Sequence, residues 1–381
     1  MRILVITYEY PPVGGGGGHV ARDISFELAR RGHELTVLTS HYNRLPREET
    51  AGNLRVIRVP VLRRMLYKAD LSTMAAFVFF GALYGLRLAR QWKPDLIHVH
   101  FAVPSGPVAW LLERFTGIPY VLTAHLGDVP GGVPEKTERW FRWVFPLSPP
   151  IWQRAARVAA VSEHTRQLAR ARYSVEIQVI PNGVDLEKLD PGRIAVHDPP
   201  QIFFAGRFMD QKNPLQVIRT LETLRELRWT CLMAGDGPLK DAAIQEIQRL
   251  GLADRFTLPG WVTPEQVNDY MAGSDILFMP SLSEGLPVIG VQSLAMGLCV
   301  VASEIGGMLD VVEPGRNGFL IDPSQPQGYR QALFELLSAP SRLLEFRRAS
   351  REKARDFDIC GVASAYEEIF RSVLENDRKG G

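Results

Sequence analysis

A carboxylate and the start of a predicted helix lie close together in the C-terminal half of the chain. Glu284 follows an apolar stretch, residues 275–279, that is typical of a strand, and Gly285 opens the turn after it. The backbone amides that follow at once are expected in the first turn of a helix, and Gln292 lies eight residues after Glu284. Free N–H groups at a helix N-terminus bind anions, and a carboxylate accepts hydrogen bonds from hydroxyl groups. This pattern predicts a site for a polar, phosphorylated ligand.

Two cations follow another predicted strand, residues 202–205. Arg207 comes directly after Gly206, and Lys212 lies five residues further on, before a predicted helix. Arginine offers a forked pair of N–H donors and lysine a point charge, so together they suit a diphosphate. The alternative is two solvated cations on a loop. The glycine before Arg207 and the helix after Lys212 favour the diphosphate.

Five consecutive glycines, residues 14–18, lie between a predicted strand and a predicted helix. Glycine lets the backbone approach a ligand closely and presents N–H groups to an anion. A flexible surface loop is the alternative, which the position between strand and helix disfavours. A dinucleotide fingerprint fits poorly, because His19 or Val20 occupies the place of its third glycine. The second strand also ends at Ser40 without the acid that would bind a ribose.

Two aromatic ring systems also follow predicted strands. His125 comes directly after residues 120–124 and can serve a ligand, although a structural histidine bonded to backbone is the alternative. His98 and His100 share one face of the preceding strand and have weaker claims. Trp261 would border a flat ring, with ordinary packing as the alternative. No histidine pair with a carboxylate has metal-ligand spacing, so no metal site is predicted.

Predicted strands alternate with helical segments along the whole chain, which indicates an α/β protein with parallel sheets covered by helices. Strands are expected at 3–8, 35–40, 54–59, 96–100, 120–124, 158–162 and 178–180, and again at 202–205, 230–234, 256–258, 276–280 and 300–303; helices are expected at 19–31, 215–227, 264–272 and 360–375. Proline and glycine breakers between 184 and 201 indicate a linker. The sequence thus predicts two Rossmann-like domains, 1–190 and 191–381, facing a central cleft. The last helix is compatible with packing on either domain.

Length and charge restrict the function further. The 381 residues suit two domains, and a formal net charge of +2 gives no argument for nucleic acid. Three scattered cysteines fit neither a disulfide framework nor a zinc pattern, which indicates a reducing compartment. No secretory signal is visible, so a cytoplasmic protein is expected. The uncharged run 71–86 is shorter than the roughly 18 to 20 residues that span a bilayer, and predicts a buried or interfacial helix.

Taken together and in order, these motifs resemble the retaining GT-B glycosyltransferases of family 4, the "glycosyl transferases group 1" class. The matching motifs are Pro11-Pro12 with Gly14–Gly18, Arg31-Gly32-His33, His125-Leu126-Gly127, Pro181-Asn182-Gly183-Val184, Gly206-Arg207 with Lys212, Gly235-Asp236-Gly237, residues 284–297, Gly306-Gly307 and Asn317-Gly318. Each motif is weak by itself, whereas the ordered set covers nearly the whole chain.

The resemblance implies a nucleotide-sugar donor, with UDP- or GDP-sugar expected, and no cofactor or metal. Arg207 and Lys212 would neutralise the diphosphate, Glu284 would contact hydroxyls of the transferred sugar, and His125 would lie beside that sugar. The donor-binding residues implied are Gly15, Gly16, Gly17, Asn182, Gly206, Trp261, Val262, Gly285, Leu286, Val288 and Gln292. The anomeric configuration would be retained, with front-face attack and the departing phosphate as base.

Two positions depart from the family pattern. Gln292 stands where the family usually has the Glu that holds the ribose hydroxyls, and Pro287 replaces a usual glycine, which removes one N–H donor. Donor affinity or donor choice is therefore expected to differ from that of typical members. A catalytically silent nucleotide-binding module and a GT-B nucleotide-sugar epimerase remain alternatives. A phosphorylase would need a lysine motif for its pyridoxal cofactor, which the sequence does not display.

The sequence gives the least information about the acceptor. Residues 62–86 and 140–154 mix cations with large apolar side chains, as interfacial segments do. Core-facing helices whose arginine stems lie along apolar surface are the alternative. The hypothesis is a glycan or lipid-linked acceptor and a peripheral contact with the inner face of the membrane. The oligomeric state is left open.

Overall fold

The computed structural model describes residues 1–65, 69–133, 146 and 148–380, and the chain divides into two compact units. The first unit comprises Met1–Gly183 and Ile359–Gly381, and the second comprises Val184–Asp358. The boundary that the sequence suggested after residue 190 therefore falls inside the second unit. The physical reason is that the linker hydrogen-bonds there: Val184 N donates to Phe357 O at 2.8 Å, and Arg351 donates to the carbonyl of Leu189 at 2.8 Å.

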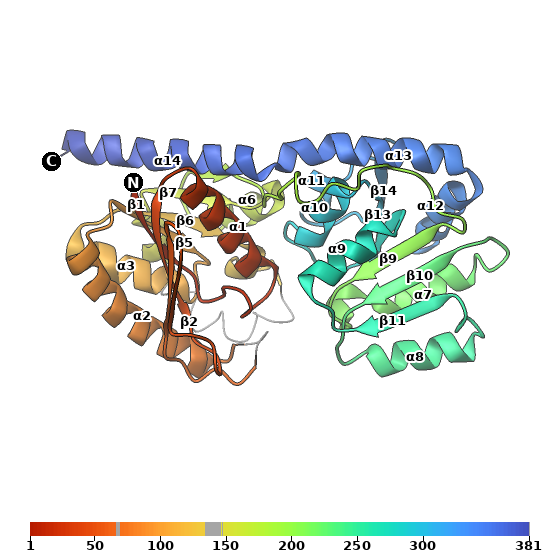
Figure 1. Cartoon of the computed structure of the whole chain (residues 1–381), viewed down its shortest axis with the longest axis horizontal. Coiled ribbons are helices and arrows are strands. Elements are labelled where there is room, and N and C mark those ends of the chain that lie inside the picture. Colours follow the sequence, from red (N-terminus) through yellow and green to blue (C-terminus); the bar gives the residue numbers. More distant parts are fainter. Residues whose placement is uncertain (66–68, 134–145, 147, 381) are drawn as a thin grey trace. The chain divides into compact units, whose positions relative to one another are not determined.

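The first unit is built on a mostly parallel sheet in the order β3-β4-β2-β1-β5-β6-β7-β8 (Figure 1). Its strands are β1 (Arg2–Ile6), β2 (Glu34–Ser40), β3 (Glu48–Ala51), β4 (Leu54–Val59), β5 (Leu96–His100), β6 (Tyr120–Ala124), β7 (Arg157–Ala160) and β8 (Ile177–Val179). The chain runs from β1 outward in one direction and later returns to continue from β5 in the other. The switch point of this sheet, where such sheets bind ligands, is therefore between β1 and β5.

Helices cover this sheet. They are α1 (Gly16–Arg30), α2 (Leu71–Trp92), α3 (Ser105–Thr116), α5 (Pro149–Gln153), α6 (Glu163–Arg170) and α14 (Ile359–Gly380), with a 3₁₀ turn η1 (Leu126–Asp128). Among the described residues, α2 is the one helix that is long and apolar enough to cross a membrane by length and composition: it has 22 residues, and the mean hydropathy of its most apolar 18-residue window is 1.5. It is longer than the uncharged run because it continues through Arg87 and Arg90.

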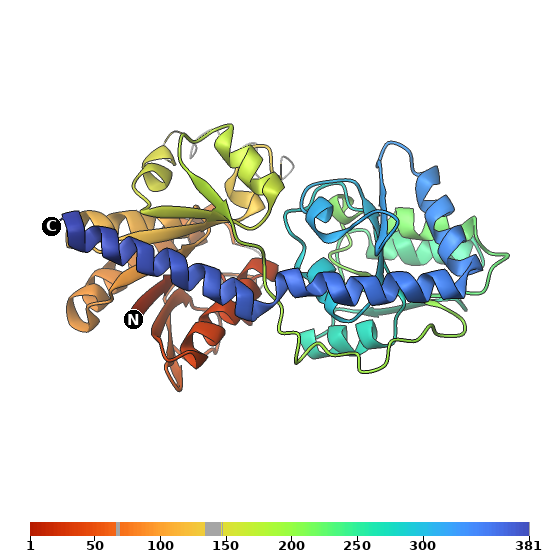
Figure 2. The same cartoon turned by 90° about the horizontal axis from the view of Figure 1, so that it is seen from above.

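Helix α14 belongs to the first unit, and the Arg31-Gly32-His33 motif explains how it is held (Figure 2). Arg31 Nη2 donates to the carbonyl of Cys360 at 2.6 Å, and His33 Nε2 lies 2.7 Å from the Glu367 carboxylate. A second contact is deeper in the unit, where the Tyr366 hydroxyl hydrogen-bonds Thr123 at 2.9 Å. The motif thus fastens the last helix to the helix that follows the glycine loop.

The second unit contains a parallel sheet in the order β11-β10-β9-β12-β13-β14. Its strands are β9 (Gln201–Ala205), β10 (Thr230–Ala234), β11 (Phe256–Gly260), β12 (Ile276–Met279), β13 (Cys299–Ser303) and β14 (Gly318–Ile321); its helices are α7 (Pro214–Glu222), α8 (Lys240–Arg249), α9 (Pro264–Ala272), α10 (Val288–Ala295), α11 (Met308–Val311), α12 (Gln327–Ser338) and α13 (Pro340–Lys353), with 3₁₀ turns η3 (Asp210–Lys212) and η4 (Ala354–Phe357). Here the switch point is between β9 and β12.

Two arginines of α13, the buried Arg347 and the half-buried Arg351, fix the C-terminal end of α10. Arg347 pairs with Asp275 in the core, and its Nε donates to the carbonyl of Gly297 at 2.8 Å. Arg351 donates to the carbonyl of Ala295 at 2.7 Å. The backbone N–H of Gln201 also donates to Asp275 at 2.8 Å, so this buried ion pair has the additional hydrogen bonds that buried charges need. These hydrogen bonds fix the end of α10 that is opposite to its N-terminus.

The observed elements confirm the predicted fold class, with small differences at element ends. Helix α1 begins at Gly16, earlier than residue 19, because the last glycines of the loop form its first turn. Helix α7 ends at Glu222 rather than 227. The sequence pattern missed β3, which carries only exposed polar and small residues, and β14, which is short and half-buried.

Candidate active site

Lys212 and Glu284 meet at the switch point of the second unit. Lys212 Nζ lies 2.5 Å from Glu284 Oε1, and their side chains are 18% and 6% exposed. The two loops that carry them are tied together: Leu282 N donates to the carbonyl of Gln211 at 2.8 Å, and Gln211 Nε2 donates to the carbonyl of Ser283 at 2.9 Å. A largely buried ion pair therefore lies at the switch point, between the loops that follow β9 and β12.

Glycines allow the neighbouring loops to touch backbone to backbone. A Cβ on Gly235, where φ is +139°, would lie 1.9 Å from the carbonyl oxygen of Gly206. A Cβ on Gly307 would lie 1.7 Å from the carbonyl oxygen of Gly285. Both separations are far below any real contact, so each position excludes a side chain. The predicted turns after β10 and β13 therefore support the loops of Arg207 and Glu284.

Helix α10 begins four residues after Glu284. It has no side-chain N-cap and no acid in its first turn, so its positive end is not compensated locally. Pro287 precedes the helix, and its carbonyl accepts from the N–H of Gly290 at 2.9 Å. Gln292 lies one turn further along and is half-buried. The predicted combination of a carboxylate with a helix start is present.

The remaining predicted residues of this unit follow other strands. Arg207 comes directly after Gly206 at the end of β9 and is half-buried. Trp261 follows β11 and is 59% exposed, so core packing is not its role. Val262 next to it is half-buried. All belong to loops at the carboxyl edge of one sheet.

In the first unit the glycine loop contacts two aromatic rings. His125 stacks on Phe101 with ring centroids 4.3 Å apart and planes inclined by 25°. A Cβ on Gly17 would lie 2.5 Å from Phe101 Cζ and 3.4 Å from His125 Nδ1. The carboxyl ends of β5 and β6 and the loop after β1 therefore meet at the switch point of this sheet. The glycine loop and His125, which the sequence singled out separately, are therefore neighbours in this unit.

His125 is buried and neutral near pH 7. Burial lowers its pKa to about 4, and its Nε2 has no hydrogen-bond partner among the described residues. Its backbone N–H donates to Asp128 Oδ2 at 2.8 Å. A neutral imidazole held in this way can donate or accept one hydrogen bond. Both the ligand-binding and the structural interpretation of His125 therefore find support, because its backbone is hydrogen-bonded while its ring Nε2 is not.

Three neighbours of His125 were not singled out from the sequence. Asp128 is 2% exposed, and burial raises its pKa to about 7 against hydrogen bonds from backbone N–H groups that lower it. Glu9 Oε2 accepts from Gly15 N at 2.9 Å and so shapes the glycine loop. Phe101 has a φ of +72°. Glu9 and Asp128 stand beside the glycine-loop and His125 motifs and could have been found there, whereas nothing in the sequence marks Phe101.

The predicted site residues thus fall into two groups. Gly15, Gly16, Gly17, His125 and Asn182 belong to the first unit. The residues of the second unit are Arg207, Lys212 and Glu284 with the remaining donor-binding positions, Gly206, Trp261, Val262, Gly285, Leu286, Val288 and Gln292. Asn182 follows β8 and is 4% exposed. Within the described ranges, no three His, Cys, Asp or Glu side chains are grouped as a metal site.

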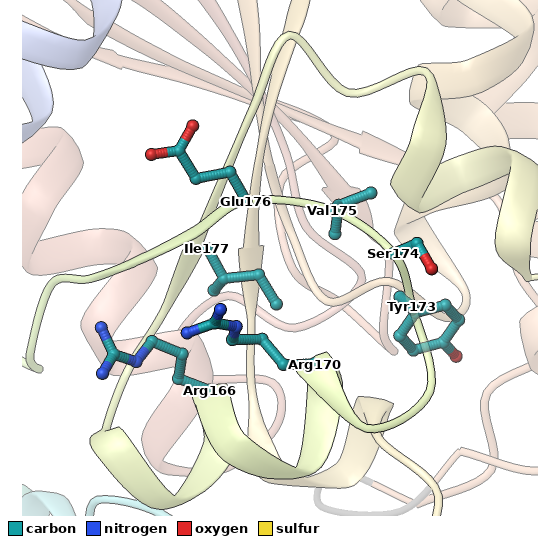
Figure 3. Close-up of a pocket in the computed structure, with 7 residues that line it drawn as sticks. All are labelled: Arg166, Arg170, Tyr173, Ser174, Val175, Glu176 and Ile177. Atoms are coloured by element: carbon teal, nitrogen blue, oxygen red, sulfur yellow. The ribbon is translucent and has the colours of Figure 1, made fainter.

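A pocket of about 540 Å³ also lies in the first unit, between α6 and β8 (Figure 3). It is lined by Arg166, Arg170, Tyr173, Ser174, Val175, Glu176 and Ile177. In Figure 3 the Glu176 carboxylate points away from both arginines. None of the predicted site residues lines this pocket, so it is distinct from the candidate site.

Comparison with known proteins assigns both halves of the chain. Residues 14–188 match the model described as "Glycosyltransferase Family 4", and residues 187–357 match "Glycosyl transferases group 1". D-inositol 3-phosphate glycosyltransferase 2 of Catenulispora acidiphila is 30% identical, over 82% of this chain and 79% of that protein.

Solved structures share the fold. Sucrose-phosphate synthase of Thermosynechococcus elongatus has a TM-score of 0.83 at 21% identity, covering 98% of this chain and 99% of that one. The Anabaena protein Alr3699/HepE, solved in complex with UDP-glucose, has a TM-score of 0.75 at 19% identity and covers 98% and 100%. With two parallel-sheet units and these matches along its length, the chain belongs to the family 4, or group 1, glycosyltransferases and is a GT-B enzyme that transfers glycosyl groups.

Proposed function

We propose that this enzyme transfers a sugar from a nucleotide-diphosphate sugar to a glycan or lipid-linked acceptor, with retention of anomeric configuration. The observation that carries the proposal is the Lys212–Glu284 ion pair beside the uncapped start of α10. One group can take a phosphate and the other a sugar hydroxyl, and a helix N-terminus stands next to them. The expected role is synthesis of a cell-surface glycan or glycolipid, at the cytoplasmic face of the membrane.

The diphosphate would be held by Arg207, Lys212 and the first N–H groups of α10. Before donor binding, the charge of Lys212 is balanced by Glu284, which keeps a carboxylate from repelling the incoming phosphates. With the donor bound, Lys212 would share its charge between Glu284 and the phosphate. Negative charge grows on the diphosphate as it leaves, so fixed cations stabilise the transition state more than the ground state. This arrangement needs no metal ion.

The sugar step balances without an additional base. The C1–O bond to the diphosphate breaks while the acceptor oxygen bonds C1 on the same face, and the acceptor proton moves to the departing phosphate oxygen. Glu284 would hold hydroxyls of the transferred sugar, and His125 would offer its ring nitrogen to a substrate hydroxyl. His125 is neutral at pH 7, so this would be a hydrogen bond without charge.

The base of the donor is expected to be uracil or guanine. The UDP-glucose complex of the structurally similar Anabaena protein supports a uridine donor. Gln292, one turn into α10, is the proposed contact to the ribose hydroxyls. An amide there binds without charge, so weaker nucleotide binding than in family members with Glu is expected.

Thermal unfolding of the full chain with UDP, GDP and ADP tests the donor assignment. One nucleotide should raise the melting temperature at concentrations above its Kd, because ligands of the native state stabilise it. The matching nucleotide sugar is then incubated with glycan and polyprenyl-linked acceptors, and the anomeric proton of the product is read by NMR. A product of inverted configuration contradicts retention.

Other outcomes of the same experiment separate the alternatives. Nucleotide binding without turnover on any acceptor favours a silent module. An altered free sugar nucleotide without transfer favours an epimerase. Failure of all three nucleotides to stabilise the protein contradicts the proposed donor site.

A further inference from the structure

Helix α2 buries one face and leaves several of its large apolar side chains exposed. Its most apolar window is only 28% buried. The buried face includes Gly81 and Gly85, where an added Cβ would lie 3.2 Å from Val108 and 2.9 Å from Leu112 of α3. Glycines at these positions let α3 pack closely against α2. Phe77 and Leu88 of α2 join the core, whereas Leu71, Phe79, Leu83 and Tyr84 stay exposed, so the helix is also apolar on its outer side.

The exposed apolar residues gather on and beside this helix. The apolar face consists of Leu62, Met65, Leu71, Phe79, Leu83 and Tyr84, which are half of the twelve large apolar residues that are exposed in the described part of the chain. Leu71, Phe79 and Leu83 recur at helical spacing and form one stripe. Thr73 Oγ1 donates to the carbonyl of Leu62 at 3.2 Å, which places Leu62 beside the first turn of α2. Contiguous apolar surface of this kind marks an interaction site.

Cations flank the apolar face at both ends. Arg64 is exposed before the helix, and Arg87, Arg90 and Lys93 are exposed at its C-terminal end. None of these four forms an ion pair within the described ranges. The one acid on the described part of this segment, Asp70, accepts from the N–H of Thr73 and caps the helix. The segment thus carries a positive charge around an apolar stripe, the pattern of an interfacial helix.

We propose that the apolar face and its flanking cations form a docking surface for an anionic lipid bilayer. The helix would lie in the plane of the interface, with Phe79 and Leu83 among the acyl chains and Arg87 at the headgroups. A spanning orientation is excluded by the fold, because Thr73 and Phe77 are buried within the unit and α2 connects two strands, β4 and β5, of one sheet. A second copy is a poorer occupant, since symmetric pairing would bring like charges together.

Residues 62–86 and 140–154 are the two segments for which the sequence predicted a peripheral membrane contact. Residues 66–68, 134–145 and 147 lie outside the described residues and carry no part of it. The described part of the second segment includes Ile151 and Trp152, which are buried, so they are not a membrane surface. Vesicle binding by α2 stands independently of the donor chemistry, whereas its use for presenting a lipid-linked acceptor rests on the proposed function.

Flotation of the full chain with vesicles tests the proposal. Vesicles of phosphatidylcholine alone are compared with vesicles that also contain phosphatidylglycerol, at low and high salt. Binding to the anionic vesicles that weakens with salt is expected, because exposed charges are screened. The variant Phe79→Ser with Leu83→Ser should lose about tenfold or more in vesicle affinity, which corresponds to at least about 1.4 kcal/mol. Arg87→Gln with Arg90→Gln should lose affinity for the anionic vesicles alone.

Phe26→Ser is the matched control, because Phe26 is 51% exposed on α1 and lies outside the apolar face. It should float like the wild type. Circular dichroism and nucleotide-induced thermal stabilisation check that every variant is folded.

Absence of flotation at low salt, or equal binding to both vesicles without salt dependence, overturns the proposal. A dimer in light scattering that Phe79→Ser disrupts, without vesicle binding, assigns the face to a second copy instead. Vesicle binding by a protein that no nucleotide stabilises would contradict the donor site and leave the docking surface intact.

Discussion

The Lys212 ammonium and the Glu284 carboxylate form an ion pair at 2.5 Å although 72 residues separate them in sequence. Glu284 is buried, and Lys212 is its ion-pair partner in the site. The pair places a cation beside carboxylate oxygens that can accept hydrogen bonds from hydroxyl groups. It lies between the loops that follow β9 and β12. Removing either member should therefore affect both the site and the local electrostatics.

Lys212→Ala should reduce transfer by roughly 10²–10³ in kcat, because a fixed cation at the developing phosphate charge is lost. Steady-state kinetics with the identified donor measure this loss. Lys240→Ala, which removes a half-buried lysine paired with Asp236 in the same unit, should keep near-normal rates. A kcat within twofold of wild type in Lys212→Ala rejects the diphosphate assignment.

Gly307→Ala should destabilise the second unit by about 1–3 kcal/mol, since its Cβ would overlap the carbonyl oxygen of Gly285. The displaced loop carries Glu284, so nucleotide affinity should fall as well. Urea unfolding and calorimetric titration measure the two effects. Gly361→Ala on α14 is the control, because nothing lies within 4 Å of its added Cβ and helix propensity favours alanine. Unchanged stability in Gly307→Ala would mean that the two loops are not in contact.

His98→Gln should reduce the acid sensitivity of the protein. Burial lowers the pKa of His98 to about 3, so the unfolded state takes up a proton that the folded state refuses between about pH 6.5 and pH 3. The stability contributed by the neutral ring is present above pH 6.5 and is lost as the pH falls. Between pH 7.5 and pH 5 the variant should lose about 2 kcal/mol less than the wild type in urea unfolding. Equal losses would indicate that the ring is not buried.

Asp128→Asn should act with the opposite sign. Burial raises the pKa of Asp128 to about 7, so the carboxyl contributes stability that is present below about pH 4 and lost as the pH rises through 7. An amide does not ionise, and the stability of the variant relative to wild type should rise between pH 5 and pH 8. Thermal unfolding across this range measures the difference. A relative stability that falls with pH would show that Asp128 is ionised in the folded state well below pH 7.

Gln292→Glu should tighten nucleotide binding by roughly fivefold, because hydrogen bonds to a charged acceptor exceed neutral ones by about 1 kcal/mol. Calorimetric titration with UDP or GDP measures the change. The nucleotide that lacks the ribose 2′-hydroxyl is the control, and the gain should shrink with it. An identical donor profile in both proteins would place Gln292 outside the ribose pocket.

The sequence by itself determined the architecture and most of the candidate site. Alternating apolar strands and helices require parallel sheets, and ligands bind such sheets at the carboxyl ends of strands. Residues directly after strands, such as Arg207, Glu284 and His125, could therefore be selected without coordinates. Element ends also followed from local rules, as at α9, whose predicted and observed bounds agree.

Only the tertiary structure decided which of these residues meet. The order of strands in a sheet is a long-range property, and it alone makes β9 and β12 neighbours and pairs Lys212 with Glu284. The stacking of Phe101 on His125 depends on three separate loops, which leave no local sequence signal. The apolar run beginning at Leu71 fitted either a buried or an interfacial helix by composition. Packing decided between the two, because α3 covers the face that carries Gly81 and Gly85, Phe77 joins the core, and Phe79 and Leu83 stay exposed.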